Sequence, residues 1–411
     1  MKNRRIIVVL LQLTVFSLLL TGCWDSLEID NRSLILGIAI DEAGPDAAKE
    51  EDLTNHKKLD SPDLNANMIR LTAQIAVAGR IPLGPGSGGD SENSAKGKNS
   101  PVWVVEVLGH TIDDAMNNLQ QEIADPRFLI HLRVIVVSKK IAEKGLVNLN
   151  DYLRRNPEVR RSTWLLVADK QAADFMNVAP PLERVPTLYL LSMIEKSIAM
   201  GKFPQAFLST FWSNDSKLGQ SAYLPYVSIR QGQNVLIKGL AYFKDNKLAG
   251  TTTYPMEIGV FMAAKGINPG GFTTLFPVKD IGYVMVRTTN RKSHISIQIK
   301  NGKPHANVYV RLQSELGEKY DEQSKIDSEK SLKTIELEQE RWIANVIHDL
   351  IKKTQKDKSD IFGFGEYVRA HERSFWNKSI QEKRDWENMY ADMSVTIKVK
   401  VNIRRVGMKI Y

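Results

Sequence analysis

A single cysteine, Cys23, is the feature that most constrains this chain of 411 residues. A lone cysteine cannot close an internal disulfide, so the folded body depends on apolar burial and hydrogen bonding. Its neighbours indicate where that body begins. Residues 1–5, MKNRR, carry three positive charges, and the fifteen residues 6–20, IIVVLLQLTVFSLLL, carry none. This order is that of a secretory signal, and fifteen helical residues span only about 22 Å of a bilayer core of roughly 30 Å.

The four residues Leu20-Thr21-Gly22-Cys23 resemble a bacterial lipobox, in which the cysteine is diacylated through its sulfur and becomes the first residue after cleavage. Two acyl chains give stable membrane anchoring, whereas one binds only marginally. Residues 1–22 are therefore predicted to be a cleaved lipoprotein signal peptide, and Cys23 is predicted to be the lipidation site. The alternatives are an uncleaved signal anchor and an ordinary signal peptide that leaves Cys23 as a free thiol.

The composition of the mature chain indicates its class and the kinds of partner that it can bind. Removing residues 1–22 leaves 389 of the 411 residues, more than one hydrophobic core usually organises. The chain is 43% hydrophobic and 25% charged, which is ordinary for a folded globular protein. The formal charge of +9 falls to +6 without Lys2, Arg4 and Arg5, and the other basic residues are scattered among acidic ones. No nucleic-acid partner is predicted, because such binders concentrate basic and aromatic side chains, whereas mild attraction to an anionic membrane is expected.

Residues 23–180 are predicted to form an N-terminal α/β domain. Strand-like apolar runs alternate there with helical patterns, which favours a mixed sheet with one face covered. Thr111 begins one helix and Asp169 is placed to cap another. The polar stretch 42–66 and the Gly/Ser-rich stretch 81–100 are expected to be flexible loops. The expected strands lie at 33–41, 67–79, 102–109, 129–138 and 162–169, with a further helix at 148–155.

Residues 181–283 are assigned to a middle domain. The three prolines of APPLERVP, residues 179–186, mark its beginning, because proline continues neither a helix nor a central strand. A helix is predicted at 187–202 and a hairpin at 236–250.

Residues 284–411 are predicted to form a C-terminal α+β domain, an antiparallel sheet packed with a long helix. The strands 294–300 and 306–313 alternate in polarity, and Asn301-Gly302 between them is a strong hairpin signal. The closing strand 394–404 alternates in the same way. The helix, at about 325–356, carries an apolar stripe expected to pack on the sheet, with a coiled-coil contact to a partner as the alternative. The stripe consists of Ile326, Leu332, Ile335, Trp342, Ile343, Val346, Ile347, Leu350 and Ile351.

The sequence offers no catalytic, metal-binding or cofactor-binding set, so the chain is predicted not to be an enzyme. Its seven histidines are dispersed, and His371-Glu372 lacks the second histidine of a zinc-protease helix. No Gly-x-Ser-x-Gly elbow occurs. In the run from Phe362 to Tyr367, FGFGEY, a third spaced glycine is absent, which argues against dinucleotide binding. We expect these glycines to terminate the long helix and to let the aromatic residues pack under it.

Motifs near both ends of the mature chain, taken in order, point to one group of lipoproteins. They are CWDSLEI at 23–29, ILGIAID at 35–41, SDIFGFGEYVRAH at 359–371, FW at 375–376, Trp386 and VTIKVKVNIRRVG at 395–407. Together they resemble the Ger(x)C family of spore germination lipoproteins, the C subunits of nutrient germinant receptors in endospore-forming bacteria.

The resemblance implies a non-enzymatic, lipid-anchored subunit on the outer face of the spore inner membrane. It also implies two polytopic membrane subunits as partners, one of them permease-like, and a role in the germination response to nutrients. Only the lipidation role of Cys23 carries over residue by residue. A solute-binding lipoprotein of an ABC importer is the alternative, and it would show two similar lobes that close on a ligand. A lipid-anchored cell-wall hydrolase is a third hypothesis, and no metal-binding or nucleophile motif in the sequence supports it.

Overall fold

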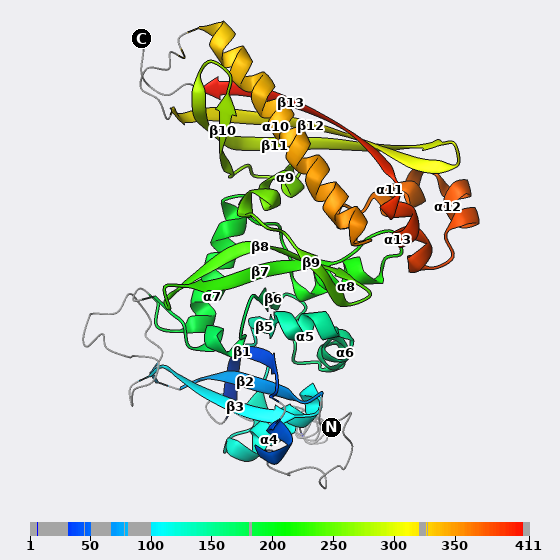
Figure 1. Ribbon diagram of the computed structural model, residues 1–411. Helices are drawn as coiled ribbons and strands as arrows, with labels where there is room; N and C mark the ends of the chain where they lie inside the picture. The colour runs from blue at the N-terminus through cyan, green and yellow to red at the C-terminus, as the bar shows by residue number, and fades with distance from the viewer. Residues whose placement is uncertain are drawn as a thin grey trace.

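Two β-sheets organise the computed structural model of the chain (Figure 1). The sheet nearer the N-terminus, with its helices, is here called the N-terminal lobe. The other sheet, with the helices of residues 255–265 and 329–391, is called the C-terminal lobe. The structure describes residues 6, 32–44, 46–50, 67–77, 79–80, 100–180, 183–319, 326 and 328–405.

The N-terminal lobe is built on a mixed sheet. In sheet order its strands are β3 (Val102–Gly109), β2 (Ile69–Ala76), β1 (Ser33–Glu42), β5 (Val134–Ser138), β6 (Trp164–Ala168), β7 (Tyr223–Arg230), β8 (Asn234–Lys244) and β9 (Lys247–Thr251), with β4 (Arg127–Phe128) beside β1. The central strands β1, β5, β6 and β7 are parallel, and antiparallel strands flank them. Each predicted strand is confirmed, but 129–138 becomes a strand only at Val134, because residues 129–132 form a turn that buries Leu129 and Leu132.

Helices cover both faces of this sheet, whereas the sequence predicted one covered face. They are α2 (Ala47–Glu50), α4 (Ile112–Glu122), α5 (Lys139–Lys144), α6 (Val147–Arg155), the 3-10 helix η2 (Ala173–Met176), α7 (Pro186–Ala199) and α8 (Leu208–Ser216). Along β5, Ile135 and Val137 join the hydrophobic cluster of α4, α5, α6 and α8, while Val134 and Val136 join that of η2 and α7. Parallel strands buried on both faces carry continuous apolar runs, and VIVVS is such a run.

Local signals in the N-terminal lobe act as predicted. Thr111 is the N-cap of α4, and its side chain accepts a hydrogen bond from the Asp114 amide. The helices expected at 148–155 and 187–202 are α6 and α7. The predicted hairpin is β8–β9, in which Asp245 and Asn246 take the positive φ values that its tight turn requires.

The C-terminal lobe is built on the strands β10 (Thr273–Val278), β11 (Gly282–Lys300), β12 (Lys303–Lys319) and β13 (Ser394–Arg405), in that sheet order. Asn301 and Gly302 form the turn between β11 and β12, as predicted, with φ of 50° and 74°. The prediction of an antiparallel sheet is wrong for one pair, since β13 runs parallel to β12. The intervening helices carry the chain back to the starting end of β12, so β13 leaves in the same direction.

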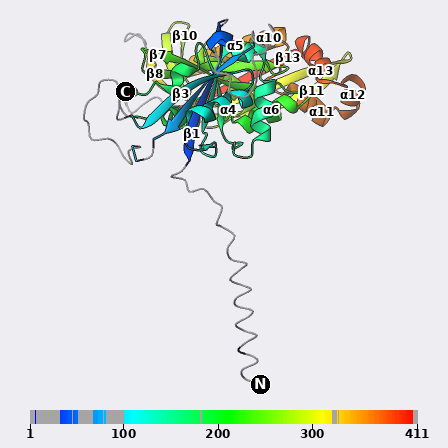
Figure 2. The same ribbon diagram turned by 90° about the horizontal axis from the view of Figure 1, so that it is seen from below.

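The predicted long helix is confirmed as α10, and its apolar stripe faces the core. The helices of this region are α9 (Pro255–Lys265), α10 (Glu329–Lys356), α11 (Phe364–His371), α12 (Arg373–Ser379) and α13 (Lys383–Ala391). Ile335, Ile343, Ile347, Leu350 and Ile351 are buried, as the core-packing interpretation of the stripe requires. Both ribbon views place α11–α13 on the side of the molecule away from β10 (Figure 2).

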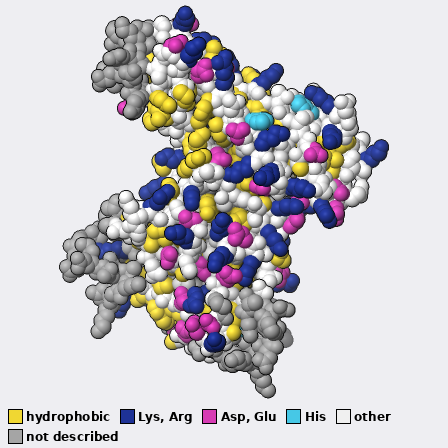
Figure 3. All heavy atoms as spheres, in the orientation of Figure 1, with side chains coloured by type: hydrophobic (Ala, Val, Ile, Leu, Met, Phe, Trp, Pro, Cys, Tyr) yellow, Lys and Arg dark blue, Asp and Glu magenta, His cyan; other side chains and the backbone are white. Residues whose placement is uncertain are grey.

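One hydrophobic cluster runs through both lobes. It includes Trp164 and Leu190 of the N-terminal lobe together with Val308 and Leu350 of the C-terminal lobe. The first sheet crosses residue 180, because β6 pairs with β7. The domains 23–180, 181–283 and 284–411 remain a prediction about independent units. Charges of both signs are interspersed over the face drawn in Figure 3, in line with their scatter in the sequence.

Candidate functional site

The predicted lipidation site, Cys23, lies outside the described residues, as do most of the loops 42–66 and 81–100. Lipidation of Cys23 therefore stays a prediction. Among the described residues, no helix is both long and apolar enough to cross a membrane. The same residues contain no group of three or more His, Cys, Asp or Glu side chains placed to hold a metal ion.

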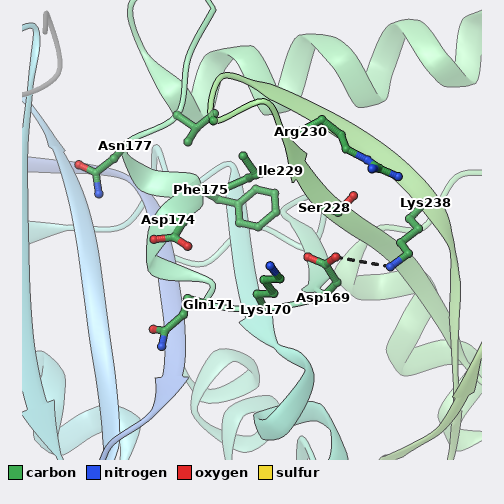
Figure 4. Close-up of a pocket in the computed structure, with 12 residues that line it drawn as sticks. Asp169, Lys170, Gln171, Asp174, Phe175, Asn177, Ser228, Ile229, Arg230 and Lys238 are labelled. Atoms are coloured by element: carbon green, nitrogen blue, oxygen red, sulfur yellow. Dashed lines mark hydrogen bonds and ion pairs between the residues drawn. The ribbon is translucent and has the colours of Figure 1, made fainter.

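The candidate ligand site is a cavity of about 590 Å³ at the carboxyl ends of β6 and β7 (Figure 4). One wall is the segment after β6, here called the 169–178 loop, and the other is formed by β7 and β8. The crevice outside the carboxyl ends of parallel strands is the usual ligand position in open α/β sheets. The lining residues are Asp169, Lys170, Gln171, Asp174, Phe175, Asn177, Val178, Ser228, Ile229, Arg230, Gly232 and Lys238.

Asp41, at the end of β1, holds the 169–178 loop in place. Its two carboxylate oxygens accept hydrogen bonds from the amides of Ala172 and Ala173, each at 2.8 Å. Burial raises the pKa of Asp41, and the two amide contacts lower it in part. The prediction that Asp169 caps this segment is wrong, because these amides donate to Asp41 of β1, which is separated from β6 by β5 in the sheet. The sequence did not predict this contact, because the partners are more than 130 residues apart along the chain.

Asp169 contributes to the cavity instead. Its carboxylate lies 3.5 Å from Lys238 Nζ, and that ammonium lies 5.4 Å from the centre of the Tyr226 ring. Burial, with the charge of Asp169, raises the pKa of Tyr226. The Ser228 hydroxyl, also in the lining, is buried without a hydrogen-bond partner in the described structure. A buried hydroxyl without a hydrogen-bond partner costs free energy, and Ser228 is such a group in this wall.

The FGFGEY motif forms a second site, a junction between helices. Asp360, buried just before it, accepts hydrogen bonds from the amides of Gly363 at 2.8 Å and Gly365 at 3.0 Å. The Trp386 indole of α13 donates to the same carboxylate at 3.0 Å. Burial raises the pKa of Asp360 to about 6 against these contacts. The motif thus fixes α11 on α13 through one carboxylate.

The same junction reaches the N-terminal lobe. The Ser221 amide donates to the Asp360 carbonyl at 2.8 Å, and the Ser359 hydroxyl donates to the carbonyl of Phe243 at 2.8 Å. A Cβ on Gly365 would lie 2.5 Å from Gly219 Cα, so glycine is required for this close approach of two backbones. The motif is therefore part of a structural joint between the lobes.

The expectation that its glycines end the long helix is wrong, although the aromatic packing is confirmed. The long helix α10 already ends at Lys356, and Lys358 takes a left-handed φ of 54°. Gly363 instead precedes α11, with a φ of 73°. Phe362 and Phe364 are fully buried beside it.

Sequence reasoning missed most cavity residues. Ser228, Arg230 and Lys238 lie on two strands that meet the 169–178 loop only in the folded sheet. The available signal was the position of Asp169, a polar residue directly after a buried strand.

Two family models match most of the chain in succession. Residues 25–229 match the spore germination protein N-terminal domain, and residues 238–407 match the spore germination B3/GerAC-like C-terminal domain. The chain belongs to the Ger(x)C family of spore germination proteins. The joint around Asp360 lies in the second of these family regions, and the cavity is built mainly from the first.

Known Ger(x)C relatives are similar over most of their length. Spore germination protein GerQC of Bacillus cereus is 23% identical over 76% of this chain and 85% of its own. Spore germination protein KC of Bacillus subtilis (strain 168) is 23% identical over 100% of this chain and 97% of its own. The crystal structure of the GerBC protein matches with a TM-score of 0.52 at 19% identity, over 82% of this chain and 93% of that one, which shows a shared fold.

Proposed function

We propose that this chain is a non-catalytic, lipid-anchored subunit of a nutrient germinant receptor in the spore inner membrane. The observation that carries the proposal is the succession of two spore germination family regions from residue 25 to residue 407. The lipobox-like Leu20-Thr21-Gly22-Cys23, immediately before the first region, supports the anchor. Together they favour a protein held at the outer face of that membrane and needed for the response to nutrients.

The anchor would keep the N-terminal lobe close to the bilayer. Ser33, where β1 begins, follows Cys23 by ten residues. At an upper limit of roughly 3.5 Å per residue, β1 begins within about 35 Å of the lipid surface. Two acyl chains on Cys23 supply stable attachment without a membrane-spanning segment. This geometry suits contacts with the two polytopic partner subunits, one of them permease-like.

A pull-down from dormant-spore inner membrane tests this function. Tagged wild-type chain and Cys23→Ala are solubilised in detergent, and co-purifying proteins are identified by mass spectrometry. Two polytopic receptor subunits are expected with the wild type and are expected to be reduced with Cys23→Ala. Deletion of the gene together with its paralogues is expected to block nutrient germination and to leave sporulation intact. Normal nutrient germination in that strain would refute the proposal.

The fold speaks against the alternative of a solute-binding lipoprotein of an ABC importer. Such proteins close two similar lobes around a ligand. Here the lobes differ, with a mixed sheet ordered around β1, β5, β6 and β7 in one and the sheet β10–β13 in the other. Recovery of an ABC permease in the same pull-down would favour the alternative.

A further inference from the structure

One face of the second sheet is buried and the other is open. Ile295 of β11 and Val308 of β12 pack in the hydrophobic cluster that contains Phe261 of α9, Ile347 of α10 and Phe364 of α11. Side chains alternate between the two faces along a strand, so the neighbours of these strand residues point to the other face, where they are exposed or half-buried. The centre of this open face, here called the basic face, consists of Lys292, His294, Tyr309, Arg311, Lys398 and Lys400.

Strand pairing places these six residues in two rows. In the first row, Lys292 of β11 lies opposite Arg311 of β12, and Arg311 lies opposite Lys400 of β13. Neighbouring strands are about 4.8 Å apart, so the three basic side chains begin within about 10 Å of one another. Like charges in opposed positions destabilise a sheet, so this row favours an anion over it. The second row, two residues along each strand, consists of His294, Tyr309 and Lys398.

Acidic side chains are missing from this part of the open face. Lys400 pairs with Glu340 of α10 at 3.2 Å. The other three cations, Lys292, Arg311 and Lys398, form no ion pair within the described residues. Positive charge is thus concentrated here, although charges of both signs are mixed over the face drawn in Figure 3. The rows on either side of the basic face carry uncharged polar residues, namely Asn290, Gln313, Asn402, Ser296, Asn307 and Thr396.

The basic face is turned away from α10. Figure 1 shows α10 in front of β11 and β12, so the open face of the sheet lies behind them. In Figure 2 α10 lies at the upper margin of the molecule, and β1 begins at the lower margin. The basic face and the beginning of β1, which the proposed anchor would hold near the lipid, are therefore both on the side away from α10.

The composition of this face favours lipid headgroups over a protein or a nucleic acid. Protein interfaces have an apolar, aromatic-rich centre, and none of the large exposed hydrophobic side chains lies in these rows. Nucleic acids stack their bases on several aromatic side chains, and Tyr309 is the only Phe, Tyr or Trp residue here. A layer of phosphate groups requires only cations and hydrogen-bond donors.

We propose that the basic face binds the phosphate groups of anionic phospholipids at the membrane surface. The inference rests on the proposed function for the presence of a membrane, and it adds a non-covalent contact in the C-terminal lobe. Lys292, Arg311 and Lys398 donate charge-assisted hydrogen bonds to phosphate oxygens. With the N-terminal lobe held at Cys23, this contact keeps the C-terminal lobe against the bilayer.

Acetylation of individual lysines in the reconstituted full-length chain tests the proposal. Nanodiscs are made of phosphatidylcholine alone or of an equal mixture of phosphatidylcholine and phosphatidylglycerol, and mass spectrometry gives the acetylation rate of each lysine. Lys292 and Lys398 are expected to react about fivefold more slowly in the anionic discs, and high salt is expected to abolish the difference. Lys352, exposed on α10, is expected to react at the same rate in both.

Charge variants separate a specific contact from general attraction. Arg311→Gln is expected to remove most of the protection of Lys292 and Lys398, whereas Lys352→Gln, which removes the same charge from α10, is expected to preserve it. The proposal is overturned if Lys292 and Lys398 react equally in the two discs, or if Lys352 is protected as strongly as they are. It is also overturned if Arg311→Gln leaves the protection intact, and loss of the polytopic subunits from the spore pull-down with that variant would then assign the face to an acidic protein segment. These rates are measured without partner subunits or nutrients, so failure here is distinguishable from failure of the proposed function.

Discussion

Asp360 is a single residue on which a whole joint depends. Its carboxyl group is buried, and burial raises its pKa from an ordinary value of 3.8 to about 6 in the folded protein. Because the folded pKa is the higher one, the folded state binds the proton more tightly than the unfolded state does. The stability that this provides is complete below pH 3.8 and is lost as the pH rises through about 6.

Asp360→Asn is expected to remove this pH dependence. Between pH 4 and pH 7 the wild type is expected to lose up to about 3 kcal/mol of unfolding free energy relative to the variant, at about 1.4 kcal/mol per pKa unit. The Asn side chain has one acceptor oxygen, so a constant loss of stability is added at every pH. Urea unfolding at a series of pH values measures both effects. Parallel pH profiles for the wild type and Asp360→Asn would contradict the prediction, and Asp349→Asn, which is exposed, serves as control.

Gly365 is a second residue that the joint requires. A methyl group there would lie 2.5 Å from Gly219 Cα and 2.5 Å from Trp386 Cε2. Gly365→Ala is expected to lower the unfolding free energy by about 1–3 kcal/mol, as overpacking does. Gly44→Ala is the matched control, because a Cβ at Gly44 meets nothing within 4 Å. Equal urea midpoints for the two variants would show that the backbones separate without cost.

At the scale of elements, α10 protects the outer edge of the second sheet. β13 is an edge strand, and an exposed edge offers free amides to other chains. Glu340 accepts a hydrogen bond from the Val401 amide at 3.0 Å, and Glu336 accepts one from the Ile403 amide at 2.9 Å. A helix that packs on the sheet thus also occupies the hydrogen-bonding positions of its edge.

Removal of both carboxylates is expected to promote self-association. The double variant Glu336→Ala/Glu340→Ala exposes two amides of β13, so light scattering is expected to show a mass that rises with protein concentration. Glu338→Ala, on the same helix but paired with Arg341, is expected to match the wild type. If the double variant keeps the mass of the wild type at every concentration, these carboxylates do not protect the edge.

At the scale of the whole molecule, Arg291 of β11 links the two lobes. It is 1% exposed, and its guanidinium donates to the carbonyls of Gly201, Gly259 and Pro269. Gly201 follows α7 in the N-terminal lobe, so these contacts span the lobe boundary. Burial lowers the pKa of Arg291 to about 10, which leaves it charged at neutral pH.

Arg291→Met is expected to destabilise the protein by about 2–3 kcal/mol. The substitution leaves buried carbonyls without donors, and each such loss carries a desolvation cost. Arg311→Met, exposed on the neighbouring strand β12, is expected to change stability by less than about 0.5 kcal/mol. Thermal unfolding of the two variants beside the wild type gives the comparison. A midpoint for Arg291→Met as high as that of Arg311→Met would show that the contacts add no stability.

Elements whose signals are local were predictable from the sequence. Such signals depend on residues that are close together along the chain. They predicted the strands at 33–41 and 102–109, the Asn301-Gly302 hairpin and the apolar stripe of α10. The candidate cavity was not predictable, because Asp169, Ser228 and Lys238 meet only through the parallel pairing of β6 with β7 and the return of β8.

The sequence by itself predicted which of its strongly periodic segments become strands or helices, and its motifs indicated the family that the two family models then showed. Each of these follows from periodicity, capping residues or motif order along the chain. Only the tertiary structure decided that β13 pairs in parallel, that Asp41 rather than Asp169 holds the 169–178 loop, and that Ser359 and Asp360 bond to the N-terminal lobe. These features depend on contacts between segments more than 80 residues apart in the sequence, and side-chain polarity along the chain does not encode which partners meet.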